Sequence, residues 1–167
     1  MSKSPAQHGA PTPAVAALVR AGVAHTLHPY EHDPASDLGY GLEAAAAIGV
    51  EPVRVFKTLC VEADGALAVA IVPVDAMLDL KSLASALGAK RATMADPAAA
   101  ERATGYVVGG ISPIGQKRRL KTVLDASAMG FEAVYVSGGR RGLDIGLSPS
   151  DLAAVTGATT APIARRG

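Results

Sequence analysis

The chain has 167 residues, of which 49% are hydrophobic, and its formal net charge is +1 at pH 7. This length suits one domain with a single hydrophobic core. The near-neutral charge excludes a protein that binds nucleic acid through a uniformly basic surface. No apolar run is long enough to cross a bilayer, and residues 1–11 are polar rather than signal-like. We therefore expect a disordered tail over 1–11, a domain over 12–167, a cytoplasmic location, and no contact with membranes or DNA.

Cysteine and histidine are the residue types that most often bind metals. The one cysteine, Cys60, excludes an internal disulfide and a zinc site built from several cysteines. It lies in an apolar run, which favours a buried structural thiol over a nucleophile. His25, His28 and His32 are close together with Asp33 after them, but this spacing matches no zinc motif. We read them as partly exposed strand and loop histidines, and we predict no metal and no cofactor.

Capping residues, helical spacing of apolar residues and terminal glycines predict five helices. Their expected ranges are 12–22, 40–49, 79–88, 96–105 and 148–157. Strands are expected at 25–29, 55–62, 66–73, 90–94, 106–108, 122–125, 133–137, 142–147 and, at one edge, 161–166. A hairpin turn is predicted over Ala63, Asp64 and Gly65, and a second turn over 137–140. This irregular alternation of helices and strands predicts a mixed α+β fold, with helices packed on a mixed sheet.

The stretch 104–120 contains four glycines, one proline and a basic triplet at its end. Glycine allows a close approach of a ligand to the backbone, and Pro113 fixes one dihedral angle. A loop of this composition can direct several backbone N–H groups at one oxyanion or phosphate. Taken alone, the stretch is more typical of a surface turn with charged flanks. It matches neither a Walker A motif nor a dinucleotide-binding fingerprint.

Lys57 lies in the first strand of the predicted hairpin, on the face that also carries Val55, Leu59 and Val61. An ammonium group on an apolar face must reach solvent, find a partner or serve a function. Basic residues are grouped as Lys117, Arg118, Arg119 and Lys121, as Arg140 and Arg141, and as Arg165 and Arg166. Such groups form either solvated surfaces or local contacts with phosphate.

An ordered series of short motifs spans nearly the whole chain after residue 11. The motifs are Thr12-Pro13-Ala14, Tyr30-Glu31-His32-Asp33-Pro34, Phe56-Lys57-Thr58-Leu59, Leu78-Asp79-Leu80-Lys81, Met94-Ala95-Asp96-Pro97, Thr104-Gly105-Tyr106, Gly109-Gly110-Ile111-Ser112-Pro113, Tyr135-Val136-Ser137-Gly138-Gly139, Arg141-Gly142-Leu143-Asp144-Ile145 and Ile163-Ala164-Arg165-Arg166. In these motifs the chain resembles the YbaK/EbsC family of aminoacyl-tRNA deacylases, in its Cys-tRNA(Pro) deacylase branch. It departs from the family pattern at Phe56, where tyrosine is frequent, and at Lys121, where proline is frequent.

This resemblance implies a single-domain mixed sheet with a barrel-like core surrounded by helices, related to the insertion domain of prolyl-tRNA synthetase. It also implies trans-editing: hydrolysis of Cys-tRNA(Pro), and of Cys-tRNA(Cys) as a further substrate, alongside prolyl-tRNA synthetase. Cysteine and proline are similar in size, so one pocket separates them poorly and a second site must remove the error. The family is thought to use the thiol of the substrate cysteine, which attacks its own carbonyl. The protein then has to orient the aminoacyl group and stabilise an oxyanion.

The resemblance also implies roles for individual residues. The catalytic set is Lys57, Gly109, Gly110, Ile111 and Ser112. The residues expected to bind substrate are Tyr30, Phe56, Thr58, Pro113, Ser137, Gly138 and Asp144. The residues expected to bind the acceptor end of tRNA are Lys117, Arg118, Arg119, Arg140 and Arg141. Three alternatives stay open: a deacylase for alanine or serine, a non-catalytic module that binds tRNA or a synthetase, and an unrelated small-molecule enzyme.

Overall fold

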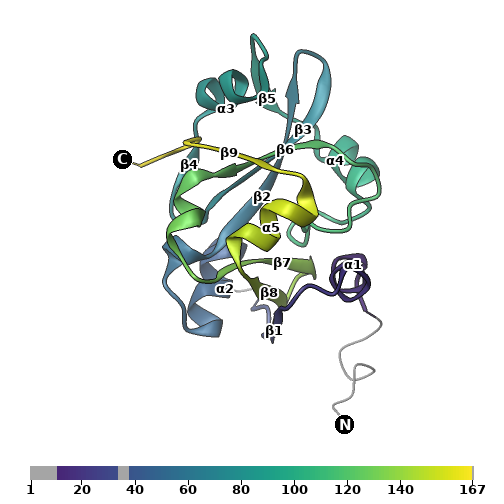
Figure 1. Cartoon of the computed structure of the whole chain (residues 1–167), viewed down its shortest axis with the longest axis vertical. Coiled ribbons are helices and arrows are strands. Elements are labelled where there is room, and N and C mark those ends of the chain that lie inside the picture. Colours follow the sequence, from purple (N-terminus) through teal and green to yellow (C-terminus); the bar gives the residue numbers. More distant parts are fainter. Residues whose placement is uncertain (1–10, 34–37, 167) are drawn as a thin grey trace.

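The structure is a computed structural model that describes residues 11–33 and 38–166. Its helices are α1 (Pro13–Ala21), α2 (Tyr40–Ile48), α3 (Leu80–Leu87), α4 (Pro97–Thr104) and α5 (Pro149–Thr156), with short 3-10 turns η2 (Pro52–Arg54) and η3 (Ala126–Gly130). Its strands are β1 (Thr26–Pro29), β2 (Phe56–Ala63), β3 (Ala66–Pro73), β4 (Met77–Leu78), β5 (Ala92–Met94), β6 (Lys121–Asp125), β7 (Val134–Arg140), β8 (Leu143–Leu147), β9 (Thr159–Ala161) and β10 (Ala164–Arg165). Figure 1 shows the long β2–β3 hairpin rising toward α3, with β1, β7 and β8 at the opposite end beside α1.

The strands of the described residues form three sheets. The largest has the order β5-β2-β3-β6-β9 and is mixed, because β2 pairs antiparallel with β3 and β5 whereas β6 pairs parallel with β3 and β9. The second has the antiparallel order β1-β8-β7, and β10 pairs with β4 in the third. An isolated bridge between Val55 and Tyr135 joins the start of β2 to β7. The mixed α+β prediction is confirmed.

The expected barrel-like core is wrong, because the described strands do not close into a barrel. The five-stranded sheet ends at β5 on one side and at β9 on the other. The three-stranded sheet meets it only through the single bridge at Val55, so no continuous hydrogen-bonded ladder runs round the molecule. The main core instead fills the space where the two sheets and the helices meet, and includes Ile71 and Ile145.

Local sequence signals account for most element ends. The side chains of Thr12, Asp79, Asp96 and Ser148 each accept a hydrogen bond from a backbone N–H in the first turn of the following helix. At the hairpin turn, Asp64 has φ +50° and Gly65 has φ +86°. Both residues of the two-residue loop therefore have the positive φ of the tight turn that matches the strand twist.

Two local predictions are wrong. Residues 106–108 form no strand: the Tyr106 hydroxyl donates to the carbonyl of Ile114, and Val107 is 61% exposed with no strand beside it. The turn expected over 137–140 is a continuation of β7 with a register shift between Ser137 and Arg140. The chain reverses instead at Arg141 and Gly142, because Gly142 has the positive φ of +86° that the turn needs.

Candidate active site

One pocket of about 420 Å³ lies beside β2, between the start of α2 and the glycine-rich loop after α4. Residues 55–60 line it along β2, and Ser137 and Asp144 line it from the second sheet. Gly109 and Ile111 line it from the loop. The close approach of β2 to β7 therefore brings residues from distant parts of the sequence to one cavity.

Lys57 is partly buried in this pocket. Burial lowers the pKa of its ammonium group, and the negative charge of Asp75 acts in the opposite direction. Asp75 itself forms an ion pair with Arg166, in which Nη1 lies 2.7 Å from Oδ2. No described side chain lies within ion-pair distance of Lys57, so its ammonium group can meet a negatively charged or carbonyl oxygen of a ligand.

Asp144 is the most deeply buried carboxylate of the pocket, with 5% of its surface exposed. It lies in β8 directly opposite Ser137 of β7. Burial raises the pKa of Asp144 to about 7. Tyr30 lines the same pocket, and burial, followed by the charge of Asp144, raises the pKa of its hydroxyl to about 12. An aspartate in this setting changes charge near neutral pH, which suits it to binding or releasing a cation.

The glycine-rich loop turns at its tip. The Gly110 N–H donates to the Val107 carbonyl at 2.9 Å, so this amide is already used. No described group accepts a hydrogen bond from the N–H of Gly109, of Ile111 or of Ser112. Gly109 has φ +94°. Of the predicted donors, Gly109 and Ile111 are therefore the two that combine an available amide with a position in the pocket wall.

Thr58 and Phe56 belong to the β2 wall of the pocket. Phe56 is 2% exposed and packs in the main core. The Thr58 hydroxyl is buried and, among the described residues, has no hydrogen-bond partner. A buried polar group without a partner is costly, and a ligand group in the pocket could satisfy it.

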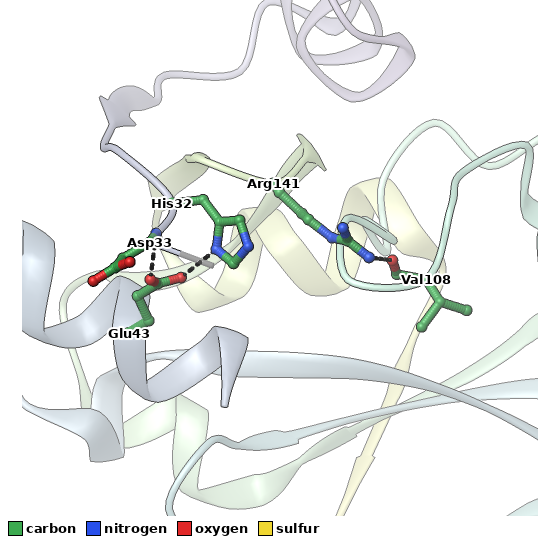
Figure 2. Close-up of polar contacts among 5 residues, drawn as sticks. All are labelled: His32, Asp33, Glu43, Val108 and Arg141. Atoms are coloured by element: carbon green, nitrogen blue, oxygen red, sulfur yellow. Dashed lines mark hydrogen bonds and ion pairs between the residues drawn. The ribbon is translucent and has the colours of Figure 1, made fainter. Parts of the chain in front are cut away.

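Arg141 contacts two residues of the pocket wall, Tyr40 and Val108. Nη2 of Arg141 donates to the Val108 carbonyl at 2.9 Å, and its guanidinium carbon lies 4.7 Å from the centroid of the Tyr40 ring. Figure 2 shows Arg141 reaching Val108, beside His32 and the carboxylate of Glu43. His32 Nδ1 lies 2.7 Å from Oε1 of Glu43, and this contact, with the Asp33 amide, holds the pKa of Glu43 below its ordinary value.

A family model and known relatives decide which family this is. The model of the aminoacyl-tRNA editing domain matches residues 40–155. Over 120 residues the chain is 39% identical to EbsC of Enterococcus faecalis, named as a candidate Cys-tRNA(Pro)/Cys-tRNA(Cys) deacylase, with 71% of this chain and 73% of that protein covered. The chain belongs to the aminoacyl-tRNA editing domain family.

Two further comparisons agree with this assignment. A crystal structure described as a candidate trans-editing enzyme for prolyl tRNA synthetase has a TM-score of 0.82 and 25% identity, covering 98% of this chain and 99% of that one. A proline–tRNA ligase of Moorella thermoacetica is 40% identical over 73 residues, which are 44% of this chain and 13% of the ligase. The chain therefore resembles one segment of that synthetase, not the whole enzyme.

In this editing domain, most of the predicted site residues do gather in one place. Those that line the pocket are Lys57, Gly109, Ile111, Tyr30, Phe56, Thr58, Ser137, Asp144 and Arg140. Gly110, Ser112, Pro113 and Gly138 do not line it. Ser112 is fully buried, and its hydroxyl accepts from the Ile114 N–H, which indicates that it shapes the loop. The assigned roles themselves stay predictions.

The basic residues expected to contact tRNA divide between two places. Arg140 lines the pocket and Arg141 contacts two residues of its wall, whereas Arg118 and Arg119 line a second, smaller hollow of about 260 Å³ between α1, α5 and the loop. Lys117 is exposed nearby, and its N–H donates to the Thr104 carbonyl. No acidic residue lines the second hollow.

Sequence reasoning missed part of the pocket of the editing domain. Tyr40 lies at its mouth, and Met94, Ala95, Pro97 and Ala100 supply an apolar side. The hydrophobic periodicity of the sequence does not distinguish these pocket residues from residues at the start of any helix or the end of any strand. Only the 94–97 motif of the family resemblance offered a signal for them.

Neither a metal-binding cluster nor a membrane-spanning helix occurs in residues 11–33 and 38–166. Over these ranges, no three histidine, cysteine or acidic side chains are grouped so that they could hold a metal ion. Over the same ranges, no helix is both long and apolar enough to cross a membrane. Cys60 is buried as predicted, and burial raises the pKa of its thiol.

Proposed function

We propose that this editing domain hydrolyses mischarged Cys-tRNA(Pro) in trans, with Cys-tRNA(Cys) as a further substrate. The observation that carries the proposal is the pocket itself, in which a half-buried lysine, a buried aspartate and free loop amides surround one cavity. A relative that is 39% identical carries the name of a deacylase for both of these substrates. No Ser-His-Asp or Cys-His set was found in the sequence, so the nucleophile has to come from the substrate or from water.

The reaction uses the thiol of the bound cysteine. Its sulfur attacks the carbonyl carbon of the same aminoacyl ester, and the carbonyl oxygen becomes an oxyanion. The bond from carbon to the ribose oxygen then breaks, and the thiol proton passes to that oxygen. The products are uncharged tRNA and a cysteine thiolactone, which water opens to free cysteine. Folding the aminoacyl group so that sulfur meets carbon supplies much of the rate.

Each polar group of the pocket has a task in this scheme. The amides of Gly109 and Ile111 donate to the oxyanion, and the ammonium group of Lys57 offsets its charge. The carboxylate of Asp144 pairs with the α-ammonium group of the substrate. The Thr58 hydroxyl, which lacks a partner among the described residues, donates to a polar atom of the same substrate.

The remaining contacts hold the substrate outside the reacting centre. The aminoacyl group and the terminal nucleoside lie between the side chains of Tyr30, Phe56 and Ser137. Arg140 binds phosphate near the mouth, and Lys117, Arg118 and Arg119 bind the tRNA backbone farther away. A net charge of +1 predicts weak tRNA binding by the domain alone, so we propose that prolyl-tRNA synthetase supplies part of the specificity. A cytoplasmic location stays part of this prediction.

A deacylation assay with purified protein tests the proposal. Cys-tRNA(Pro), Cys-tRNA(Cys), Ala-tRNA(Pro) and Ser-tRNA(Pro) are compared side by side, with and without prolyl-tRNA synthetase. We expect rapid loss of cysteine, a trapped thiolactone, and little loss of alanine or serine. Release of alanine or serine from tRNA without a thiolactone would indicate that water is the nucleophile. Loss of no amino acid, even with the synthetase present, would favour a non-catalytic binding module.

A further inference from the structure

Arg141 connects three segments that are far apart in the sequence. It belongs to the turn between β7 and β8, its Nη2 donates to the Val108 carbonyl 33 residues away, and its guanidinium group covers the ring of Tyr40 at the start of α2. Val108 and Tyr40 are both part of the pocket wall, from its loop side and its helix side. Arg141 does not itself line the pocket, but its side chain bridges these two parts of the pocket wall.

The fit between Arg141 and the loop is close. A Cβ atom built on Gly109 would lie 2.4 Å from Nε of Arg141 and 2.9 Å from Cε2 of Tyr40. Real Cβ atoms do not approach other heavy atoms so closely, and Gly109 also has φ +94°. Glycine is thus required at this position for two reasons, strain and space. The Arg141 side chain therefore lies against the loop backbone, although the residue stays exposed to solvent.

Both polar groups of the Val108 backbone are held from outside the loop. Its carbonyl accepts from Arg141, and its N–H donates to Oε2 of Glu101 in α4 at 2.8 Å. Gly109 and Ile111, whose amides are free, follow within three residues. Fixing the Val108 peptide groups on both sides therefore fixes the direction in which these amides point.

Tyr40 is itself held in place. The ring of His32 lies 5.3 Å from the Tyr40 ring at an angle of 50°. Nδ1 of His32 lies 2.7 Å from Glu43, a carboxylate with 7% of its surface exposed that also accepts from the Asp33 N–H at 2.8 Å. The ring that receives Arg141 is thus backed by His32, which Glu43 holds in place (Figure 2 shows the His32–Glu43 contact).

We propose that Arg141 is a positioning residue for deacylation: it latches the glycine-rich loop to α2, so that the amides of Gly109 and Ile111 point at the reacting carbonyl. This rests on the proposed function of the pocket. It differs from the role predicted from the sequence, in which Arg141 binds tRNA. The two roles differ in the side chain that they require. A phosphate can be bound by lysine or by arginine. A planar group that stacks on a ring and also donates to a carbonyl has to be arginine.

The kinetic test compares two substrates, Cys-tRNA(Pro) and 2′(3′)-O-cysteinyl adenosine, the second of which has no tRNA backbone. We expect Arg141→Ala and Tyr40→Ala each to lower kcat by about 10- to 100-fold on both substrates, since small misplacements of reacting groups have effects of this size. The double variant should lose little more than either single variant, because both break one contact. Arg141→Lys should not restore kcat, whereas Tyr40→Phe, which keeps the ring face, should lose far less than Tyr40→Ala.

Arg91→Ala is the matched control. It removes one positive charge from an exposed residue that does not line the pocket. A loss for Arg141→Ala that is confined to KM for Cys-tRNA(Pro), absent with cysteinyl adenosine and restored by Arg141→Lys would overturn the latch and favour a phosphate contact. If Arg141→Ala does not fold, Arg141→Lys carries the same test.

Amide hydrogen exchange gives a readout that does not depend on activity. Exchange of the hydrogen-bonded amides of Val108 and Gly110 should become faster in Arg141→Ala and in Tyr40→Ala, and should stay unchanged in Arg91→Ala. Equal exchange in all three variants would refute the latch. If the wild-type protein releases no amino acid from any substrate, the proposed function fails, while the exchange experiment still decides whether Arg141 holds the loop.

Discussion

Ser137 and Asp144 face each other across the antiparallel strands β7 and β8, and both line the pocket. The pairing lies just before the register shift in β7, where the strand no longer follows a regular ladder. Asp144 alternates along β8 with the buried Leu143 and Ile145, so it lies on the opposite face of the strand, yet it is 5% exposed. The second sheet thus presents a carboxylate to a cavity that shields it from water, which is why its pKa is raised.

The pH dependence of stability provides a first prediction. The pKa of Asp144 is about 7 in the folded protein, above its ordinary value of 3.8, so the folded state binds the proton more tightly than the unfolded chain. The free energy of unfolding should therefore fall by about 2 to 4 kcal/mol as the pH rises from 4 to 8. Asp144→Asn should remove most of this fall, as measured by urea unfolding. Glu62→Gln, at an exposed position of β2, is the control; equal pH profiles for wild type and Asp144→Asn would contradict the prediction.

Lys57 is the side chain on which catalysis should depend most. Lys57→Ala removes the only positive charge carried by the β2 wall, and we expect single-turnover deacylation of Cys-tRNA(Pro) to slow by about 100-fold or more. The melting temperature should stay the same or rise, because burial of the ammonium group opposes folding of the wild-type protein. Lys81→Ala, at an exposed residue of α3, should behave like the wild type. Near-normal turnover in a folded Lys57→Ala variant would remove Lys57 from the mechanism.

Gly110 is closed in by backbone atoms. A Cβ atom there would lie 2.8 Å from the Cα of Arg140 and 3.0 Å from the N of Arg141, and backbone cannot move aside as a side chain can. Gly110→Ala should push the loop away from β7, lowering kcat/KM by about 10-fold or more and lowering the melting temperature. Gly130→Ala introduces the same methyl group where nothing lies within 4 Å. Full activity in Gly110→Ala would show that the loop position does not matter for catalysis.

Thr58 offers a test in which stability and activity change in opposite directions. Its hydroxyl is buried without a described partner, so Thr58→Val should raise the free energy of unfolding by about 1 kcal/mol. The same change should raise KM for Cys-tRNA(Pro), because the hydroxyl can no longer bond to the substrate. Thr93→Val, on the exposed side of β5, separates this effect from a general preference of strands for valine. An unchanged melting temperature would indicate that water already satisfies the hydroxyl.

Much of the pocket could be predicted from the sequence because its residues lie in motifs with a strong local or family signal. Lys57 was found because it interrupts an apolar face, and the glycine-rich loop because of its composition. Tyr40, Met94 and Ala100 were missed because nothing local distinguishes a pocket wall from any half-buried surface. The free donors within the loop were also beyond prediction, since the Gly110 amide is used by a turn that only the folded backbone reveals.

The sequence by itself determined most of the elements and their ends, because caps, glycines and the tight turn at Asp64 and Gly65 act over a few residues. The tertiary structure decided what those elements do together. It left the sheets open where a barrel-like core was expected, buried Asp144, and placed the exposed Arg141 in contact with both Tyr40 and Val108. Each of these three features depends on which distant strands and loops come into contact. Burial of a charge and stacking on a ring contribute free energy only after those segments have packed together.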